Sequence, residues 1–349
     1  MRRCVGAIVL LAALVTGCST TPPPDAGPMQ LESFTEVAMG VEVTVTVAGV
    51  DAQARLAAAR AAMAEVRACD DALSDWQAAS ECRRLPQRAG ERVTVSDRMA
   101  DAVARSIAMA AATDGRFDPT VAPVIAAWRD ARRAGTLPDP ALVEVAMTRV
   151  GWTALHLDPD AREAWFDRDG MRLDFGGIGK GLAAERASAA LTAAGHPCHL
   201  VAVAGDIVAG PAPPPGRAGW RIRREDGLGR PVELELLGEA ISTSGDLEQF
   251  ILIGGVRHSH IVDPRTGRAM TVRTAASVRG PSGATCDALA TALCVAGTTD
   301  APRVMARFPG YRAMVTSAGD APSAAPGEAG TEPAPTITTW STRPAPGDR

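Results

Sequence analysis

An acidic residue and a hydroxyl residue are spaced to share one face of a helix in the stretch "GATCDALATALCVAG" (283–297). Asp287 and Thr291 are four residues apart, so on a helix their side chains lie one above the other. A carboxylate and a hydroxyl oxygen are hard ligands that suit Mg²⁺, which keeps its other positions for water and phosphate. The alternative is a purely structural Asp287 that interacts with the positive end of its helix. The spacing indicates a candidate metal site and leaves the capped helix open.

A second candidate site is the glycine-rich stretch "DFGGIGKGLAAE" (174–185), which leads into a helix. Backbone N–H groups in such a turn, together with the helix N-terminus, favour an anion, and Lys180 adds a positive charge there. The stretch is not a P-loop, because Gly181 follows Lys180 where Ser or Thr is required. The spacing of Gly177, Gly179 and Gly181 also misses the dinucleotide fingerprint. Phosphate binding and a tight strand-to-helix turn are the two interpretations.

A third candidate is a histidine beside a turn in "HSHIVDPRTGRAM" (258–270). Asp263 and Gly267 begin and end a typical turn sequence, with a proline between them. His258 and His260 alternate on one strand face just before this turn. A histidine there could act as a general base or could simply hydrogen-bond to the turn.

The elements that must position these side chains follow from the periodicity of the apolar residues. Valine alternates with polar residues over 41–47, which predicts a half-buried strand. Asp51 and Ser96 are suited to cap two helices, the second of which would end at Gly115. Strands that follow strands predict an α+β fold with antiparallel pairing. The other expected elements are a short helix after the Pro-rich loop near 137–140, a hairpin over 154–175, a helix that ends at Gly195, a buried strand and turn over 198–210, strands over 220–226 and 232–238, a last helix that stops at Gly297 and a closing strand over 311–317.

The glycine turn with its lysine, the histidine beside the DPRTG turn and the Asp/Thr helix follow one another in this order along the chain. Together they resemble the FAD:protein FMN transferases of the ApbE family. The resemblance covers residues 34–320, and the joint order of the motifs is more specific than any one of them. It implies an α+β fold with antiparallel sheets and packed helices in two interlocked subdomains, T-fold-like, with the flavin in a cleft between them. Further stretches that carry the resemblance are "ALSDWQAASECRRL" (72–85), "DGRFDPTVAPVIAAW" (114–128), "MRLDFGGIGKGLAAE" (171–185) and "AISTSGDLEQF" (240–250).

The resemblance implies an enzyme that takes FAD as substrate and Mg²⁺ as cofactor. It would attach FMN through a phosphoester bond to a Thr or Ser hydroxyl of an exported target flavoprotein and release AMP. Asp287, Thr291 and the carbonyl of Gly177 match the metal-binding positions, and Asp287 and His260 match the catalytic ones, His260 by assisting the attacking hydroxyl. The positions that match the flavin site are Met39, Trp76, Arg116, Phe117, Asp118, Asp174, Lys180 and Val262.

Other activities fit some of the same residues. A periplasmic FAD pyrophosphatase would use the same metal and base with water as nucleophile, and a non-catalytic flavin-binding lipoprotein would leave FAD intact. A chain that is itself modified at Ser282 or Thr285 is not favoured, because the family's acceptor sequences begin with Asp where this chain has Arg279. Val41 and Ala204 depart from the family pattern, which usually has Thr and Gly there.

The chain begins with a pattern typical of export. Arg2 and Arg3 precede an apolar run, and the ending "VTGC" at Cys18 resembles a bacterial lipobox. We expect removal of residues 1–17 as a signal peptide and lipidation of Cys18, which would tether the protein to a membrane. The enzyme would then lie on the periplasmic side of the cell envelope, with the inner membrane favoured over the outer. The remaining segments are a tether over 18–33, the transferase domain over 34–320 and a disordered Pro/Ala-rich tail over 321–349.

Charge and cysteine content exclude several classes of protein. The formal net charge of −4 gives no basic surface, which argues against nucleic acid as a partner. Apart from Cys4 and Cys18, an odd number of cysteines is left, so outside the cytoplasm at least one thiol is free or pairs between chains. Sequence separation favours a disulfide between Cys69 and Cys82. Because no CxxC occurs, neither a zinc site nor a dithiol motif is indicated.

Overall fold

The computed structural model describes residues 28–85, 87–225, 231–245, 249–318 and 336–342. The expected signal peptide and Cys18 lie outside these residues, as do most of the expected tether and most of the expected tail. Among the helices of the described ranges, none has the length and apolar character needed to cross a membrane.

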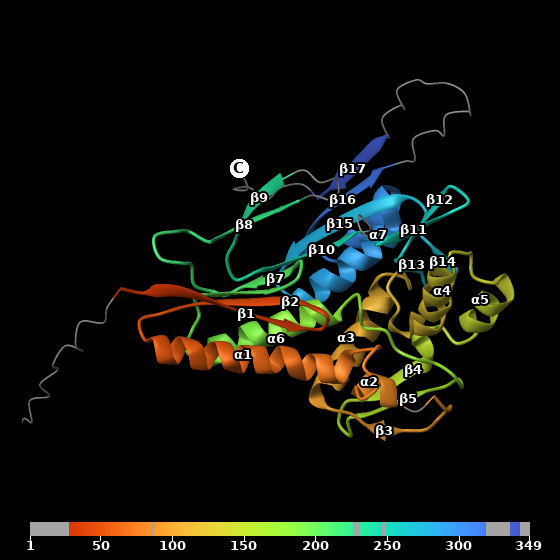
Figure 1. Ribbon diagram of the computed structural model, residues 1–349, viewed down its shortest axis with the longest axis horizontal. Coiled ribbons are helices and arrows are strands. Elements are labelled where there is room, and N and C mark those ends of the chain that lie inside the picture. The colour runs from red at the N-terminus through yellow and green to blue at the C-terminus, as the bar shows by residue number, and fades with distance from the viewer. Residues whose placement is uncertain (1–27, 86, 226–230, 246–248, 319–335, 343–349) are drawn as a thin grey trace, which may run out of the picture.

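A large antiparallel sheet forms the centre of the molecule (Figure 1). The predicted valine-rich strand is one of its members, and Val43, Val45 and Val47 are fully buried on the face that meets the helices, since strand side chains alternate between faces. All neighbouring strands pair antiparallel. Within the described residues the spatial order is β1 (Gln30–Ala38), β2 (Val41–Gly49), β6 (His199–Val203), β7 (Asp206–Ala209), β10 (Ala240–Gly245), β15 (Arg273–Gly280), β16 (Arg312–Ala318) and β17 (Ile337–Ser341).

Three long helices cover one face of this sheet, namely α1 (Ala52–Leu73), α6 (Gly179–Ala193) and α7 (Gly283–Met305). Asp51 caps α1 as predicted, because its side chain accepts a hydrogen bond from the Gln53 N–H. Leu182 of α6 and Leu289 and Leu293 of α7 are fully buried in the same apolar cluster as the valines of β2. Burial of these side chains between helices and sheet forms the main core.

The opposite face of the sheet is covered by a hairpin of β8 (Trp220–Glu225) and β9 (Pro231–Leu236). Trp220, Ile222 and Leu236 of the hairpin form a second apolar cluster with Ile241 of β10. The adjacent residue Ala240 belongs to the main core. The alternation of β10 between two apolar clusters shows that both faces of this strand are buried.

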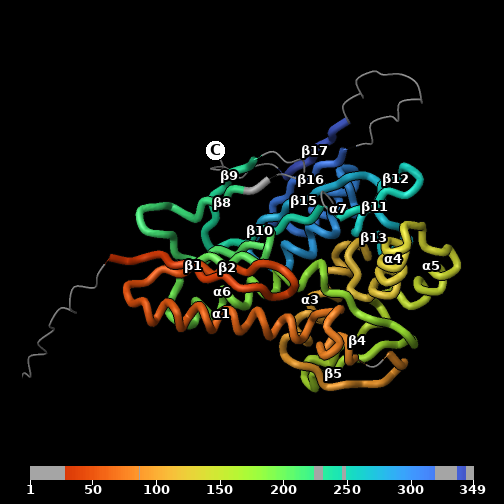
Figure 2. The backbone as a smooth tube through the Cα atoms, viewed as in Figure 1, coloured from red at the N-terminus to blue at the C-terminus, as the bar shows by residue number. Residues whose placement is uncertain are grey.

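Two excursions of the chain leave the central layers and meet at one end of the molecule, where α4, α5 and the β13–β14 turn lie side by side (Figures 1 and 2). The first runs from the end of α1 to the start of α6, and the second from β10 to β15. Their buried contact includes Val124 of α4 and Val262 of β13. This is the expected pair of interlocked parts. The first excursion holds α2 (Glu81–Arg84), β3 (Val93–Thr94), α3 (Asp97–Ala112), the 3₁₀ helix Pro119–Val121, α4 (Ala122–Ala134), α5 (Pro140–Met147), the 3₁₀ helix Trp152–Ala154, β4 (Leu155–Asp158) and β5 (Glu163–Phe166), and the second holds β11 (Phe250–Ile253), β12 (Val256–Ser259), β13 (Val262–Asp263) and β14 (Arg268–Ala269).

The structure confirms the α+β class with antiparallel sheets and corrects several details. The last helix does not stop at Gly297. It breaks there, where φ is +64°, and resumes to Met305, because Ala301 and Val304 are buried in the core. The stretch over 198–210 is a hairpin of β6 and β7, and its turn places Ala204 at a φ of +51°, a conformation that glycine adopts more easily.

Two expectations about the rest of the chain also differ from the structure. Residues 337–341 of the predicted disordered tail form β17, which pairs with β16, and β1 begins at Gln30, inside the predicted tether. Cys69 and Cys82 form no disulfide. Both are buried thiols, and Cys82 Sγ lies 3.5 Å from the carbonyl oxygen of Leu173.

Candidate active site

The N-terminal ends of α6 and α7 cross in close contact at two glycines. A Cβ atom on Gly181 would overlap the carbonyl oxygen of Gly283, and a Cβ on Gly283 would lie 2.6 Å from the carbonyl oxygen of Gly181. Glu185 of α6 strengthens the crossing, because it accepts hydrogen bonds from the Ser282 hydroxyl at 2.7 Å and from the Ala284 N–H at 3.2 Å. The predicted anion turn and the predicted metal helix therefore meet at one place.

Asp287 is buried at this crossing, with a side chain that is 1% exposed. Its Oδ2 accepts a hydrogen bond from the Gly181 N–H at 3.0 Å and lies 3.5 Å from the Lys180 Nζ. Burial and the charge of Asp206 raise the pKa of Asp287 to about 7, against the opposing effect of Lys180. The one ammonium of Lys180 thus faces two carboxylates, Asp206 and Asp287, and this excess of negative charge suits a cation site.

Lys180 lies between two buried carboxylates. Its Nζ is 3.1 Å from Asp206 Oδ2 and 3.5 Å from Asp287 Oδ2, and it donates to the carbonyl oxygen of Gly176 at 3.4 Å. Burial lowers the pKa of Lys180, but the charges of Asp206 and Asp287 outweigh burial and hold it above its usual value. Lys180 is therefore a permanent cation at the N-terminus of α6.

Thr291 lies one turn beyond Asp287, as its spacing predicts, and it packs against Gly177 and Ser244. A Cβ on Gly177 would lie only 2.9 Å from Thr291 Oγ1, so the Gly177 backbone packs directly against this hydroxyl. The Ser244 hydroxyl of β10 lies 3.2 Å from Thr291 Oγ1. The structure thus brings together Asp287, Thr291 and Gly177, the three proposed metal ligands.

The donor atoms at this crossing fit Mg²⁺. They are a carboxylate, two hydroxyls and the backbone of a glycine turn, all of which are oxygen ligands of the kind Mg²⁺ prefers. Throughout the part of the chain that the structure describes, no group of three or more His, Cys, Asp and Glu side chains could hold a metal ion. Zinc and other metals that need a cage of such side chains are therefore a poorer fit than an ion that keeps water and phosphate ligands.

Sequence reasoning assigned no role to three polar residues of the sheet, Asp206, Ser242 and Ser244. Asp206 begins β7 and is 4% exposed, and the hydroxyl of Ser242 in β10 donates to its Oδ1. The signal that could have found the two serines is the pattern "AISTSG", in which Ser242 and Ser244 alternate along one strand. Pairing of β7 with β10 brings Asp206 and Ser242 together.

Met39 and Trp76, two of the residues matched to the flavin site, lie at the edge of this crossing. Met39 has a positive φ of +54° in the β1–β2 turn, and its N–H donates to Asp70 Oδ2 at 2.8 Å. Its Cε would lie 3.5 Å from a Cβ on Gly179, at the start of α6. Trp76 packs near the same turn and is 62% exposed. An exposed ring beside a phosphate-type turn is suited to stack on a flat ligand.

Asp174 and Asp118 shape the chain before the glycine turn. The Asp174 carboxylate accepts from the Gly176 N–H at 2.8 Å, and burial, with the charge of Asp75, raises its pKa. The Asp174 N–H donates to the carbonyl oxygen of Pro119 at 2.7 Å. Asp118 caps the 3₁₀ helix that begins at this proline, because its carboxylate accepts from the Thr120 N–H at 2.8 Å. Asp118 therefore supports the turn that carries Asp174.

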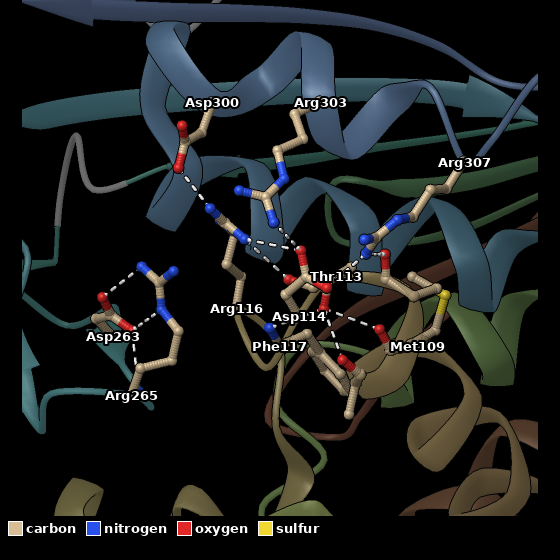
Figure 3. A network of polar contacts seen from close by, with 12 residues as sticks. Met109, Thr113, Asp114, Arg116, Phe117, Asp263, Arg265, Asp300, Arg303 and Arg307 are labelled. Carbon is tan, nitrogen blue, oxygen red and sulfur yellow. Dashed lines mark hydrogen bonds and ion pairs between the residues drawn. The ribbon is translucent and has the colours of Figure 1, made fainter.

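Arg116 and Phe117 lie deeper, between α3 and the second half of α7 (Figure 3). Arg116 is 4% exposed, and its guanidinium forms an ion pair with Asp300 and lies 3.6 Å from Asp114. Asp114 also pairs with Arg303 at 3.1 Å and with Arg307 at 2.7 Å. Phe117 is buried in the main core. Arg116 and Phe117 thus contact other parts of the protein, and none of the contacts described for them involves Lys180 or Asp287.

His260 and Val262 belong to the second excursion of the chain. The hydrogen bond described for the His260 side chain joins Nδ1 to the carbonyl oxygen of Gln249 at 3.1 Å. A carbonyl only accepts, so Nδ1 carries the proton and Nε2 has the lone pair of the neutral ring. Val262 is buried against α4 and α5. The rings of His258 and Trp128 are in contact at a tilt of 31°, with centroids 5.4 Å apart, and burial lowers the pKa of His258.

Comparisons with known proteins agree with this geometry. The model of the ApbE family matches residues 39–315. A FAD:protein FMN transferase of Rhodobacter capsulatus is 33% identical over 253 residues, which are 69% of this chain and 47% of that protein. This chain thus spans about half of that relative. A FAD:protein FMN transferase of Klebsiella pneumoniae is 29% identical over 314 residues, which are 86% of this chain and 87% of that protein.

Solved structures give the same result for the fold. The apo crystal structure of the Pseudomonas stutzeri flavinyl transferase ApbE superposes with a TM-score of 0.76 at 26% identity, covering 90% of this chain and 95% of that one. Because the family model spans β2, β6, β7, β10 and β15 of the central sheet, α6, α7 and both excursions, the match includes every element that builds the candidate site. The chain belongs to the ApbE family.

Proposed function

We propose that this chain is a FAD:protein FMN transferase that requires Mg²⁺. It transfers FMN from FAD to a Thr or Ser hydroxyl of an exported flavoprotein and releases AMP. The observation that carries the proposal is the crossing of α6 and α7, where Asp287 and Thr291 lie against the glycine turn that holds Lys180. The names of the Rhodobacter capsulatus and Klebsiella pneumoniae relatives support the same activity.

The residues at the crossing have separate tasks in this reaction. Asp287, Thr291 and the Gly177 backbone would hold Mg²⁺, which neutralises phosphate charge when it is bound. Lys180 and the N–H groups at the start of α6 bind the negative oxygens of the pyrophosphate. Fixed positive groups matter here because phosphoryl transfer depends on positioning and on stabilisation of charge. The exposed ring of Trp76 provides a surface on which the flat flavin can stack.

The transfer itself forms one bond and breaks one. The acceptor hydroxyl oxygen bonds to the phosphorus of the FMN half, and the bond from that phosphorus to the oxygen of AMP breaks. Nε2 of His260 accepts the hydroxyl proton, while its Nδ1–H donates to the Gln249 carbonyl. The AMP phosphate carries away the negative charge.

The proposed cellular setting follows from the N-terminus. Lipidation of Cys18 would tether the enzyme to the periplasmic face of the envelope, preferably at the inner membrane, where exported flavoproteins pass. Cys18 and the rest of residues 1–27 lie outside the described residues. The tether hypothesis therefore depends on the sequence pattern alone, and metabolic labelling with a radioactive fatty acid, compared between the wild type and Cys18→Ala, tests it.

The activity is tested by incubation of the chain without its signal peptide with FAD, Mg²⁺ and a Thr-containing target peptide. Mass spectrometry should show a peptide heavier by FMN, together with free AMP. The matched controls are the same peptide with Val in place of Thr and the same reaction with a chelator, and neither should give the adduct. Free FMN and AMP without an adduct would identify a pyrophosphatase instead, and intact FAD would identify a binding protein.

A further inference from the structure

Lys180 is shared unequally by two carboxylates. Its Nζ lies 3.1 Å from Asp206 Oδ2 and 3.5 Å from Asp287 Oδ2, and this second oxygen also accepts the Gly181 N–H. Asp287 is the carboxylate that the proposed cation would need. An ammonium and a divalent cation on the same oxygen would repel each other strongly at such distances, and more so in a buried site. A cation that binds this oxygen would therefore displace Lys180 from Asp287.

Asp206 is placed to receive Lys180 at that moment. It is 4% exposed, and the Ser242 hydroxyl donates to its Oδ1, so its Oδ2 is the oxygen that faces Lys180. Ser242 is itself 1% exposed and belongs to a central strand of the sheet. The position of Asp206 is thus fixed by the sheet and does not depend on a ligand.

We propose that Asp206 is a positioning residue that keeps Lys180 away from Asp287 and so leaves Asp287 available to a divalent cation. The inference rests on the proposed function, because it takes the cation site at Asp287 and Thr291 as given. With Asp206 present, Lys180 loses little when a cation takes Asp287, since its nearer ion pair remains. Without Asp206, the ion pair of Lys180 with Asp287 remains, and the ammonium competes with the cation for Asp287.

A double-mutant cycle on cation affinity tests this inference without any measurement of turnover. Mn²⁺, which accepts the same oxygen ligands as Mg²⁺, is titrated into the nucleotide-free chain, and free Mn²⁺ is followed by electron paramagnetic resonance. Asp206→Asn should weaken Mn²⁺ binding by about tenfold or more. Lys180→Met should change the affinity of the wild type by about threefold at most, but should restore about tenfold in the Asp206→Asn background.

Three other roles of Asp206 give different results in the same cycle. If Asp206 ligates the cation directly, Lys180→Met will not restore binding. If Asp206 acts only as a distant charge, Lys180→Met will tighten binding by the same factor in both backgrounds, since separate effects add. If Asp206 is merely structural, its substitution will lower the melting temperature and leave Mn²⁺ affinity unchanged. Each of these results overturns the inference.

Two controls separate the inference from the proposed function. Glu239→Gln removes a carboxylate that directly precedes β10 and pairs with Arg279 at 2.5 Å. It should leave the Mn²⁺ affinity within about twofold of the wild type. Asp287→Asn should abolish specific binding. If the wild type and every variant fail to bind Mn²⁺, with FAD present as well as absent, both the cation site of the proposed function and this inference are wrong. A cation site without coupling between Asp206 and Lys180 overturns the inference alone.

Discussion

Each half of α7 lies beside a cation that is paired with carboxylates, Lys180 at the first half and Arg116 at the second, and the two clusters differ in how the charges are matched. In the first half, the single ammonium of Lys180 serves both Asp206 and Asp287 at distances of 3.1 and 3.5 Å. In the second half, beyond the break at Gly297, Arg116 pairs with Asp300, while Asp114 is surrounded by guanidinium groups (Figure 3). The first cluster has more carboxylates than cations, and the second does not.

This difference separates carboxylates that are suited to bind a ligand from carboxylates that stabilise the fold. The arginine contacts hold the pKa of Asp114 below its usual value, chiefly through the hydrogen bond from Arg307. Burial and Asp206 raise the pKa of Asp287 instead. Both clusters contain residues that resemble flavin-site positions of the family, Lys180 in one and Arg116 in the other. The charge balance predicts that only the first depends on a ligand.

The largest expected effect is loss of activity in Asp287→Asn. FMN transfer should fall by about a thousandfold or more, because the amide cannot neutralise or orient a cation as a carboxylate does. The fold should persist, since the amide oxygen can still accept the Gly181 N–H that now reaches Oδ2. Rates are measured with the peptide assay and stability by thermal unfolding. If the variant keeps wild-type rates, the Asp287 cluster does not bind a ligand that the reaction needs, and the contrast with the Arg116 cluster is wrong.

The second cluster should show the opposite pattern in Arg116→Met. The variant should lose about 2–3 kcal/mol of unfolding free energy, because a buried guanidinium that pairs with Asp300 is replaced by an apolar chain. Urea unfolding measures this change. FAD affinity of the folded variant should stay within about twofold of the wild type. A selective loss of FAD binding at unchanged stability would instead place Arg116 in the flavin site.

The sequence predicted the local features of both regions, because they depend on neighbouring residues. The caps at Asp51 and Ser96 and the shared face of Asp287 and Thr291 follow from short spacings, and the structure contains all of them. Asp206 and Ser242 could not be assigned in this way, because they meet only through pairing of β7 with β10.

The second half of α7 shows the same limit. Gly297 does break the helix, as its type predicts, but the chain continues as helix because tertiary burial of Ala301 and Val304 overrides the local signal. The ion pair of Arg116 with Asp300 joins residues that are far apart in sequence and close only in the fold.

A smaller effect is expected from Lys180→Met on ligand binding. The affinity for FAD should fall by about tenfold, since one charge-assisted contact to the pyrophosphate is lost. Stability should change less, because Asp206 keeps the Ser242 hydrogen bond and Asp287 keeps the Gly181 N–H. Quenching of flavin fluorescence gives the affinity. Lys180→Arg, which keeps the charge, is the matched control and should retain most of the binding. Equal losses of FAD affinity and of unfolding free energy would mean that Lys180, like Arg116, mainly stabilises the fold.

The smallest effect concerns the far end of α6, which is held by a neutral contact. His199 is fully buried, with Nε2 at 2.7 Å from the Ser188 hydroxyl of α6 and Nδ1 at 2.7 Å from the carbonyl oxygen of His196. Burial lowers the pKa of His199 below its usual 6.5. Below pH 6.5 the unfolded chain therefore takes up the proton first. The stability that this histidine contributes is fully present above pH 6.5 and declines as the pH falls toward the lowered pKa, by at most about 1.4 kcal/mol per pH unit.

Urea unfolding of the wild type and of His199→Gln between pH 7.5 and 5 measures this decline as the difference between the two curves. The glutamine variant lacks the titrating ring, so the wild type should lose stability relative to it as the pH falls below 6.5. The same difference should appear in a Lys180→Met background, because the charged cluster is at the start of α6 and the neutral contact, at Ser188, is in its second half, so the two should act independently. Parallel curves would mean that His199 is not held neutral. If the difference changes in the Lys180→Met background, the His199 contact and the Lys180 cluster are coupled. That result would contradict the division into ligand-dependent charges and charges that stabilise the fold.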